Sequence, residues 1–203
     1  MLHVVKLGGS LLAAPAVLRR WLRLLADAGG RLVVVPGGGP FADAVRTAQR
    51  TVGFDDRTAH RMALLAMQQY GLLLASLEPR LVPAETMGAV RGALRRRHVA
   101  IWFPARLVAE AVEFDESWEV TSDSLAAWLA LKLGASALWL LKSCAVPVQN
   151  PARLAEAAVV DAAFPRFCAA LRCPIHVLGP DDVERLAAAL AQRDVTPAPA
   201  AAS

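Results

Sequence analysis

The sequence is poor in several residue types that would define a function class. Its 203 residues include only three cysteines, three lysines and one tyrosine. Cys144, Cys168 and Cys173 are odd in number and form no CxxC pair, which excludes a disulfide framework. Such cysteine usage is typical of a reducing compartment, so we expect a cytoplasmic protein.

Uninterrupted hydrophobic runs are also missing, although 56% of the residues are hydrophobic. The longest candidate, Leu125 to Leu141, contains Lys132, Gly134 and Ser136. It therefore predicts a helix, a turn and a strand rather than a membrane span. No basic segment precedes the first apolar run, so we expect neither a secretory leader nor a membrane partner.

Charge is moderate, at 20% of residues. This composition excludes a disordered chain and a charged scaffold. A chain of this length buries roughly 70% of its surface on folding, so its core needs no disulfide or metal. We expect a single domain over residues 1–195 and a disordered Pro/Ala tail over residues 196–203.

The basic character comes almost entirely from arginine. The formal net charge is +4 and the pI is about 9.4, yet 19 of the 22 basic residues are arginine. A general arginine bias explains this balance, so we expect no nucleic-acid partner. Where arginine is the usual cation, a retained lysine marks a place that needs a compact ammonium group.

Strands and helices alternate along the chain. Apolar strands are expected at His3–Leu7, Arg31–Val35, Arg80–Pro83, Val99–Phe103, Ala137–Leu141 and Ile175–Leu178. Helices are expected at Pro15–Ala28, Phe41–Gln49, Thr58–Leu77, Ser122–Leu133, Arg153–Ala158, Phe164–Leu171 and Asp181–Ala191. This order predicts an α/β fold, a three-layer α/β/α sandwich with a mainly parallel sheet.

Two glycine-rich loops follow the first two strands. Lys6 ends one strand before Gly8, Gly9 and Ser10, and the next strand leads into Gly37, Gly38 and Gly39. One such loop could be a plain turn. Two loops at the carboxyl edge of one parallel sheet, each opening a helix, favour binding of phosphate groups by backbone N–H groups.

Two further sites are candidates for chemistry. Thr121, Ser122 and Asp123 open a helix, where they could simply cap it or could place a carboxylate for catalysis. Lys142 and Ser143 follow the strand Ala137–Leu141, so Lys142 should reach the same sheet edge as Lys6.

Three side chains are open to two interpretations. His60 and Arg61, on the long helix and one turn after Arg57, could contact an anionic acceptor or belong to a solvated helix face. Trp118 could wall a small aromatic substrate or pack in the core.

The paired loops carry a resemblance to a known family. VVKLGGSLL at 4–12, VVVPGGGPFADAVR at 33–46, TSDSLAAWLA at 121–130 and LWLLKS at 138–143 resemble the amino acid kinase superfamily. AHRMALLAMQQYG at 59–71 and SWEVTSDSLAAWLA at 117–130 are similar to a small subfamily of aminomethylfuran-methyl phosphate kinases of methanofuran biosynthesis.

The resemblance implies a kinase that uses ATP and Mg²⁺, with the metal carried by the nucleotide and no metal site of its own. Its acceptor would be a small phosphorylated metabolite, and superfamily relatives are commonly homo-oligomers. Lys6, Asp123 and Lys142 would be catalytic, and Gly8, Gly9, Ser10 and Ser143 would bind the ATP phosphates. The remaining candidates would bind the acceptor substrate, namely Gly37, Gly38, Gly39, His60, Arg61, Thr121 and Ser122.

The sequence also departs from the superfamily pattern. Many members carry an Asp-Gly segment after the strand that ends in Lys142, whereas this chain continues Ser143-Cys144-Ala145-Val146-Pro147. Two alternatives therefore stay open. One is a kinase whose acceptor is a carboxylate or a nucleoside monophosphate, and the other is a non-catalytic nucleotide- or oxyanion-binding relative.

Overall fold

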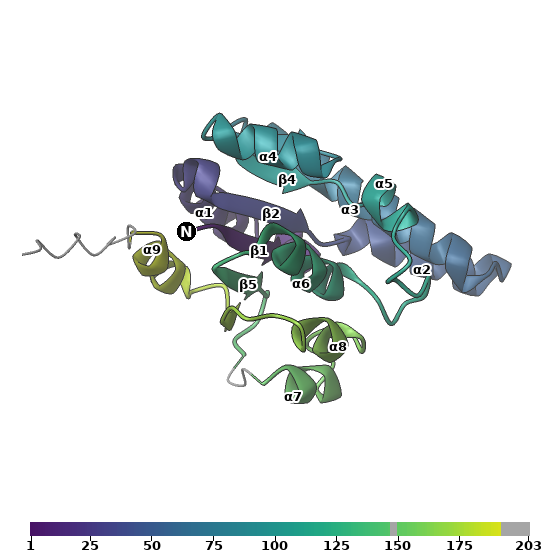
Figure 1. Ribbon diagram of the computed structural model, residues 1–203. Coiled ribbons are helices and arrows are strands. Elements are labelled where there is room, and N and C mark those ends of the chain that lie inside the picture. The colour runs from purple at the N-terminus through teal and green to yellow at the C-terminus, as the bar shows by residue number, and fades with distance from the viewer. Residues whose placement is uncertain (147–149, 192–203) are drawn as a thin grey trace, which may run out of the picture.

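The computed structural model describes residues 1–146 and 150–191. In this part of the chain six strands form one parallel sheet in the order β3-β4-β2-β1-β5-β6 (Figure 1). The strands are β1 (His3–Leu7), β2 (Leu32–Pro36), β3 (Leu81–Ala84), β4 (Val99–Trp102), β5 (Ala137–Leu141) and β6 (Ile175–Leu178). The α/β prediction is confirmed, while the tail at 196–203 lies outside the described residues.

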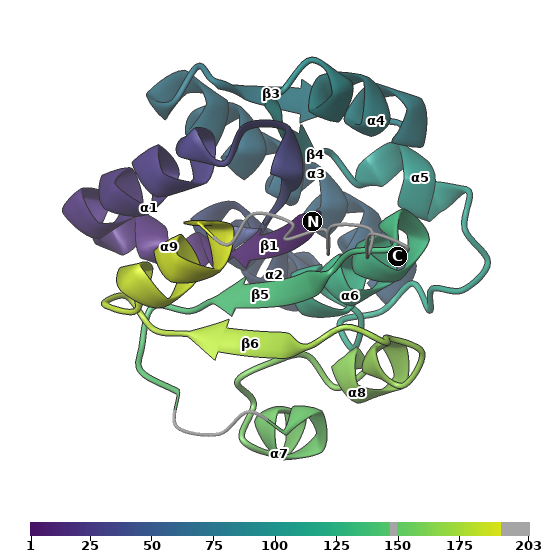
Figure 2. The same ribbon diagram turned by 60° about the vertical axis from the view of Figure 1, so that its left-hand side comes forward.

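Helices connect the strands and cover both faces of the sheet (Figure 2). They are α1 (Pro15–Asp27), α2 (Gly39–Val52), α3 (Asp56–Leu77), α4 (Met87–Arg95), α5 (Ala105–Ala109), α6 (Ser122–Leu133), α7 (Pro151–Glu156), α8 (Phe164–Cys168) and α9 (Val183–Ala191). Two short 3-10 helices, η1 (Gly9–Ala13) and η2 (Gly29–Arg31), precede α1 and β2. No helix in the described ranges is long and apolar enough to cross a membrane.

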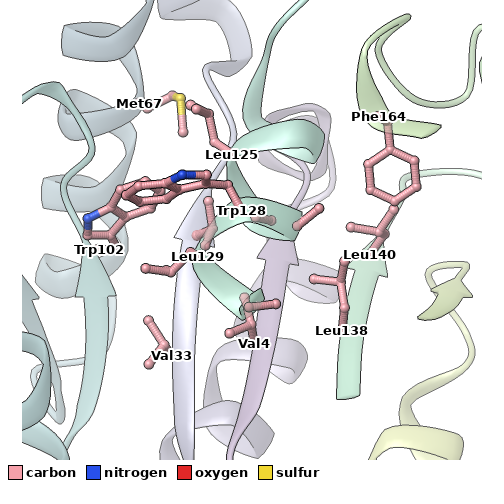
Figure 3. Close-up of a cluster of buried hydrophobic side chains, with 14 of the residues drawn as sticks. Val4, Val33, Met67, Trp102, Leu125, Trp128, Leu129, Leu138, Leu140 and Phe164 are labelled. Carbon is pink, nitrogen blue, oxygen red and sulfur yellow. The ribbon is translucent and has the colours of Figure 1, made fainter. Parts of the chain in front are cut away.

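Alternation along the strands divides the core into two layers. Val4 packs with α6 on one face, whereas Val5 and Leu7 pack with α1 and α9 on the other. In the α6 layer, Trp102 of β4 stacks on Trp128 with ring centroids 5.9 Å apart (Figure 3). Because side chains alternate with period two, Lys6 lies on the same face as Val4, towards α6.

Helix α6 is buried on nearly all sides, because it lies on β1 and β2 and is covered by α8. Its residues from Ser122 to Ala130 are all buried. A helix in such a position is apolar around its circumference rather than along one stripe. The start of α6, with its polar residues, therefore lies inside the protein at the carboxyl edge of the sheet.

Two helices were not predicted from the sequence. Helix α4 contains Gly88 and Gly92, which weaken its helical pattern, but Thr86 caps it by accepting a hydrogen bond from the Ala89 N–H at 3.1 Å. Helix α5 has only five residues, too few for a periodic signal.

Candidate active site

Three charged side chains meet at the carboxyl edge of the central strands. Asp123 Oδ1 lies 3.0 Å from Lys6 Nζ, and Asp123 Oδ2 lies 2.9 Å from Lys142 Nζ. Lys142 Nζ also donates a hydrogen bond of 2.6 Å to the Val159 carbonyl oxygen. The three residues predicted to be catalytic are therefore one connected cluster.

The fold explains why these residues meet. Lys6 of β1 pairs in register with Leu140 of β5, so Lys142 follows on the same side of the sheet two residues later. Asp123 occupies the first turn of α6, where the helix dipole favours a carboxylate. The helix start and two strand ends thus place opposite charges together.

Burial makes the electrostatics of this cluster strong. Burial would raise the pKa of Asp123, but the ammonium groups of Lys6 and Lys142 outweigh it and hold this pKa below its ordinary value. Burial, reinforced by the Lys6 ammonium group, lowers the pKa of Lys142 to about 8. Lys142 is therefore charged at neutral pH and loses its proton in mildly alkaline solution.

The two glycine loops pack directly on each other. A Cβ atom at Gly9 would lie 2.2 Å from the backbone nitrogen of Gly39, and one at Gly37 would lie 2.6 Å from the nitrogen of Gly9. Gly39 also has a positive φ of 53°, which side-chain-bearing residues rarely adopt. The contact requires glycine and fixes the two loops relative to Lys6.

The loop after β1 also contacts the loop after β5. Ser10 Oγ donates to Ser143 Oγ at 2.9 Å, and the Gly8 N–H donates to the Leu141 carbonyl oxygen at 3.0 Å. Both serine side chains are exposed. Hydroxyl groups, nearby glycines and two lysines make a donor set that suits a polyphosphate.

A cavity of about 600 Å³ lies between α2, α3 and the start of α6, and Lys6 and Asp123 contribute to its lining. This volume suits a small metabolite. The predicted site residues that line it are Lys6, Gly9, Ser10, Gly37, Gly38, Gly39, His60, Thr121, Ser122 and Asp123. Gly8, Arg61, Lys142 and Ser143 do not line it.

The two candidates on α3 have different surroundings. His60 is buried and lines the cavity. Arg61 is half-exposed and pairs with Glu116 at 2.8 Å, and Glu116 also holds Arg57 at 2.6 Å. The structure thus places His60 with the other acceptor candidates and leaves Arg61 outside the cavity.

Asp161 is a site residue that the sequence did not reveal. Its carboxylate accepts hydrogen bonds from the backbone N–H groups of Thr121 and Ser124, each at 3.0 Å, and from both of their hydroxyl groups. Asp161 therefore caps α6 in place of Thr121, whose side chain makes no capping hydrogen bond. Nothing local in the sequence connects residue 161 with this helix start.

Arg46 and Trp118 are a second feature of the cavity. The Arg46 guanidinium carbon lies 4.3 Å from the Trp118 ring centroid, and Arg46 also pairs with Asp43 at 2.9 Å. Trp118 Nε1 donates to Gln49 Oε1 of α2 at 2.6 Å. Trp118 is half-buried and lines the cavity, so it forms a wall rather than a core contact.

No group of three or more His, Cys, Asp or Glu side chains in the described residues could hold a metal ion. The lysine-rich donor set suits phosphate oxygens, because ammonium groups bind them.

The fold and the site define a family. Residues 1–145 match the model of the amino acid kinase family, and the chain belongs to it. Members of this family are ATP-dependent kinases. Solved structures of the same fold include uridylate kinase from Archaeoglobus fulgidus, with a TM-score of 0.70 and 18% identity over 94% of this chain and 95% of that one.

Other relatives support the same assignment of fold. UMP kinase from Ureaplasma parvum matches with a TM-score of 0.64 and 18% identity, over 90% of this chain and 94% of that one. A curated relative, [5-(aminomethyl)furan-3-yl]methyl phosphate kinase from Methanocaldococcus jannaschii, is 27% identical over 129 residues. That match covers 63% of this chain and only 59% of the length of the relative.

Proposed function

We propose that this protein transfers the γ-phosphoryl group of ATP to the phosphate of a small phosphorylated metabolite. The observation that carries the proposal is the buried Lys6–Asp123–Lys142 cluster beside a metabolite-sized cavity. Aminomethylfuran-methyl phosphate, which would become its diphosphate, is the proposed acceptor because of the distant similarity to the Methanocaldococcus jannaschii kinase.

We assign the two substrates to opposite sides of the cluster. Lys142 and Ser143 lie outside the cavity and adjoin Ser10 and Gly8, so this side is assigned to the nucleotide phosphates. The cavity between the glycine loop 37–39 and helix α3 is assigned to the acceptor. Lys6 stands between the two sides, where the phosphoryl group passes.

The proposed reaction forms a bond between an oxygen of the acceptor phosphate and the γ-phosphorus, and it breaks the bond from that phosphorus to the β–γ bridging oxygen. Lys6 stabilises charge on the transferred group, and Lys142 stabilises charge on the departing ADP. Asp123 holds both ammonium groups in position. Mg²⁺, carried by the nucleotide, supplies further charge neutralisation.

The acceptor needs little activation in this scheme. A phosphate monoester already carries a nucleophilic oxygen at neutral pH, so positioning and charge stabilisation can supply the catalysis. The backbone of Gly37, Gly38 and Gly39 would hold the acceptor phosphate, and Arg46 adds a positive charge at the same cavity. Trp118 offers a flat wall to a small ring.

The test is ADP release from Mg·ATP with four acceptors: aminomethylfuran-methyl phosphate, UMP, acetylglutamate and aspartate. We expect turnover with the furan phosphate and its loss by orders of magnitude in Lys6→Ala. Lys132→Ala is the matched control, because Lys132 is exposed and pairs with Glu113 at 2.9 Å away from the cavity.

The other results discriminate between the alternatives. Turnover with a different acceptor would retain the kinase and discard the furan substrate. Binding of ATP without turnover of any acceptor would favour a non-catalytic binding protein.

A further inference from the structure

One buried nitrogen in the cavity region has no partner in the described structure. The His60 side chain is 3% exposed, and its Nδ1 lies 3.0 Å from the Ser117 carbonyl oxygen. Its Nε2 is buried and makes no hydrogen bond with any described residue. A buried polar atom without a partner costs free energy, so such an atom marks a place where a ligand could supply one.

The contact with Ser117 determines which ring nitrogen carries the proton. A carbonyl oxygen only accepts hydrogen bonds, so Nδ1 must be the protonated nitrogen. In the neutral ring Nε2 then presents a lone pair and can only accept. Burial lowers the pKa of His60, and the Arg61 guanidinium group adds to this effect. The Ser117 contact and the Glu116 carboxylate act in the opposite direction but are outweighed. The lowered pKa favours the neutral ring.

The position of the ring is set by α3. His60, Ala63, Leu64 and Met67 recur at helical spacing and all line the cavity. The first member of this row is the imidazole, and the others are apolar. The glycine loops and Lys6 line the same cavity, so a molecule in it can meet phosphate-binding groups, apolar walls and hydrogen-bond acceptors.

We propose that His60 is a specificity-determining residue, whose Nε2 accepts a hydrogen bond from an amino or hydroxyl group of the acceptor substrate. The substrate class is then a small phosphate monoester that carries a hydrogen-bond donor away from its phosphate. This proposal rests on the proposed kinase function. In this proposal the partner of His60 is a hydrogen-bond donor of the substrate, whereas the sequence suggested an anionic partner.

The unpaired Nε2 of His60 would discriminate between acceptor substrates. An acceptor with an amino group satisfies the imidazole lone pair, whereas an analogue with a methyl group leaves it buried and unpaired. Sites built to pair a polar group discriminate strongly against analogues that lack it. An aminomethyl substituent on a furan ring is one group of the required kind.

The experiment compares two acceptors and three variants. The acceptors are aminomethylfuran-methyl phosphate and its analogue with a methyl group in place of the aminomethyl group. The wild type should favour the amine by at least tenfold in kcat/KM. His60→Asn places an amide near the Nδ1 position and keeps the Ser117 contact, so it should lose this preference. His60→Gln places its amide near Nε2 and should regain part of it.

The exposed His98 supplies the matched control, and His98→Asn should keep the preference. A structural role for His60 predicts a different pattern. In that case kcat/KM declines equally for both acceptors, and His60→Asn lowers it less than His60→Gln does. That pattern, or the absence of any preference in the wild type, would overturn the proposal.

Calorimetric binding of the two acceptors separates this proposal from the proposed function. If neither acceptor is phosphorylated but the amine binds more tightly than the methyl analogue only when His60 is present, the specificity role stands and the kinase function fails. If both acceptors are turned over equally well, the kinase function stands and the role of His60 fails.

Discussion

Lys6 and Lys142 share the two oxygens of a single carboxylate, that of Asp123, although the lysines come from strands far apart in the chain. Two ammonium groups held this close repel each other unless an anion lies between them. Asp123 supplies this anion. In the proposed reaction, phosphate oxygens of the substrates would be further partners of the two lysines. Asp123 therefore keeps the two lysines together.

Replacing Asp123 by Asn should damage both stability and turnover. The substitution keeps the shape but leaves two buried ammonium groups without a counter-charge, and breaking a buried pair costs about 3–5 kcal/mol. We expect turnover to fall by about 100-fold or more, since the lysines lose their positions. Chemical denaturation and steady-state kinetics measure the two effects.

Mg·ATP should stabilise Asp123→Asn more than the wild type, because its phosphates supply the missing anion. Asp115→Asn is the control, since Asp115 is exposed and pairs with Arg166 at the surface. It should change the free energy of unfolding by less than about 1 kcal/mol. Equal effects of the two substitutions would contradict the assigned role of Asp123.

The pH dependence of activity should report Lys142. Because burial lowers the pKa of Lys142 to about 8, its ammonium group disappears as the pH rises through this value. We expect kcat/KM for ATP to decline on the alkaline side of about pH 8, since this parameter reflects groups of the free enzyme. Lys142→Arg, which stays charged, should remove the decline, and an unchanged profile would show that another group titrates.

The stability change has the opposite sign. The folded pKa of Lys142 lies below the ordinary value of 10.5, so between about pH 8 and 10.5 the unfolded chain binds more protons than the folded one. The free energy of unfolding of the wild type relative to Lys142→Met should therefore rise across this window. Falling activity with rising relative stability distinguishes loss of charge from unfolding.

The site residues that could be predicted from the sequence are those whose positions follow from the local pattern of strands and helices. Lys6 and Lys142 were predicted to share a sheet edge because Lys6 lies at the end of one apolar strand and Lys142 directly follows another. Strand alternation then fixes the side of the sheet on which they lie. Asp161 and Arg46 could not be found in this way. Asp161 reaches α6 through a loop after α7, and Arg46 becomes a site residue only because Trp118 folds back over α2.

The contact between the glycine loops should tolerate no side chain. In Gly9→Ala the new Cβ atom would lie 2.2 Å from the backbone of Gly39, so one loop must move away from the other. We expect a lower melting temperature and a loss of ATP-dependent turnover, measured by calorimetry and by ADP release.

Gly88→Ala is the matched control for this loop contact. Gly88 lies in the exposed first turns of α4, where an added Cβ meets only Thr86 Oγ1 at 3.8 Å. Alanine there should stabilise the protein by about 0.5–1 kcal/mol, because glycine is the weaker helix former. If Gly9→Ala behaved in the same way, the close packing of the loops would be wrong.

Asp161 should act as a positioning residue for Asp123. In Asp161→Ala the hydroxyl and N–H groups of Thr121 and Ser124 lose their shared acceptor, which should destabilise the protein by about 2–4 kcal/mol. We expect kcat to fall, because the start of α6 carries Asp123, which positions Lys6 and Lys142. A variant that loses stability with an unchanged kcat would limit Asp161 to a structural role.

Arg46 should contribute to binding of the acceptor phosphate. Its guanidinium group is held over Trp118 and lines the cavity, whereas Arg50, one turn later on α2, is exposed and does not. Arg46→Met keeps most of the side-chain length but removes the charge, and it should raise the acceptor KM about tenfold or more without changing KM for ATP. Arg50→Met should leave both constants unchanged.

Because the Arg46 side chain is 42% exposed, part of its effect should be screened by salt, and the difference between the two variants should shrink at high ionic strength. An increase in KM for ATP instead would place Arg46 on the nucleotide side and reverse the assignment of the two substrates to the two sides of Lys6.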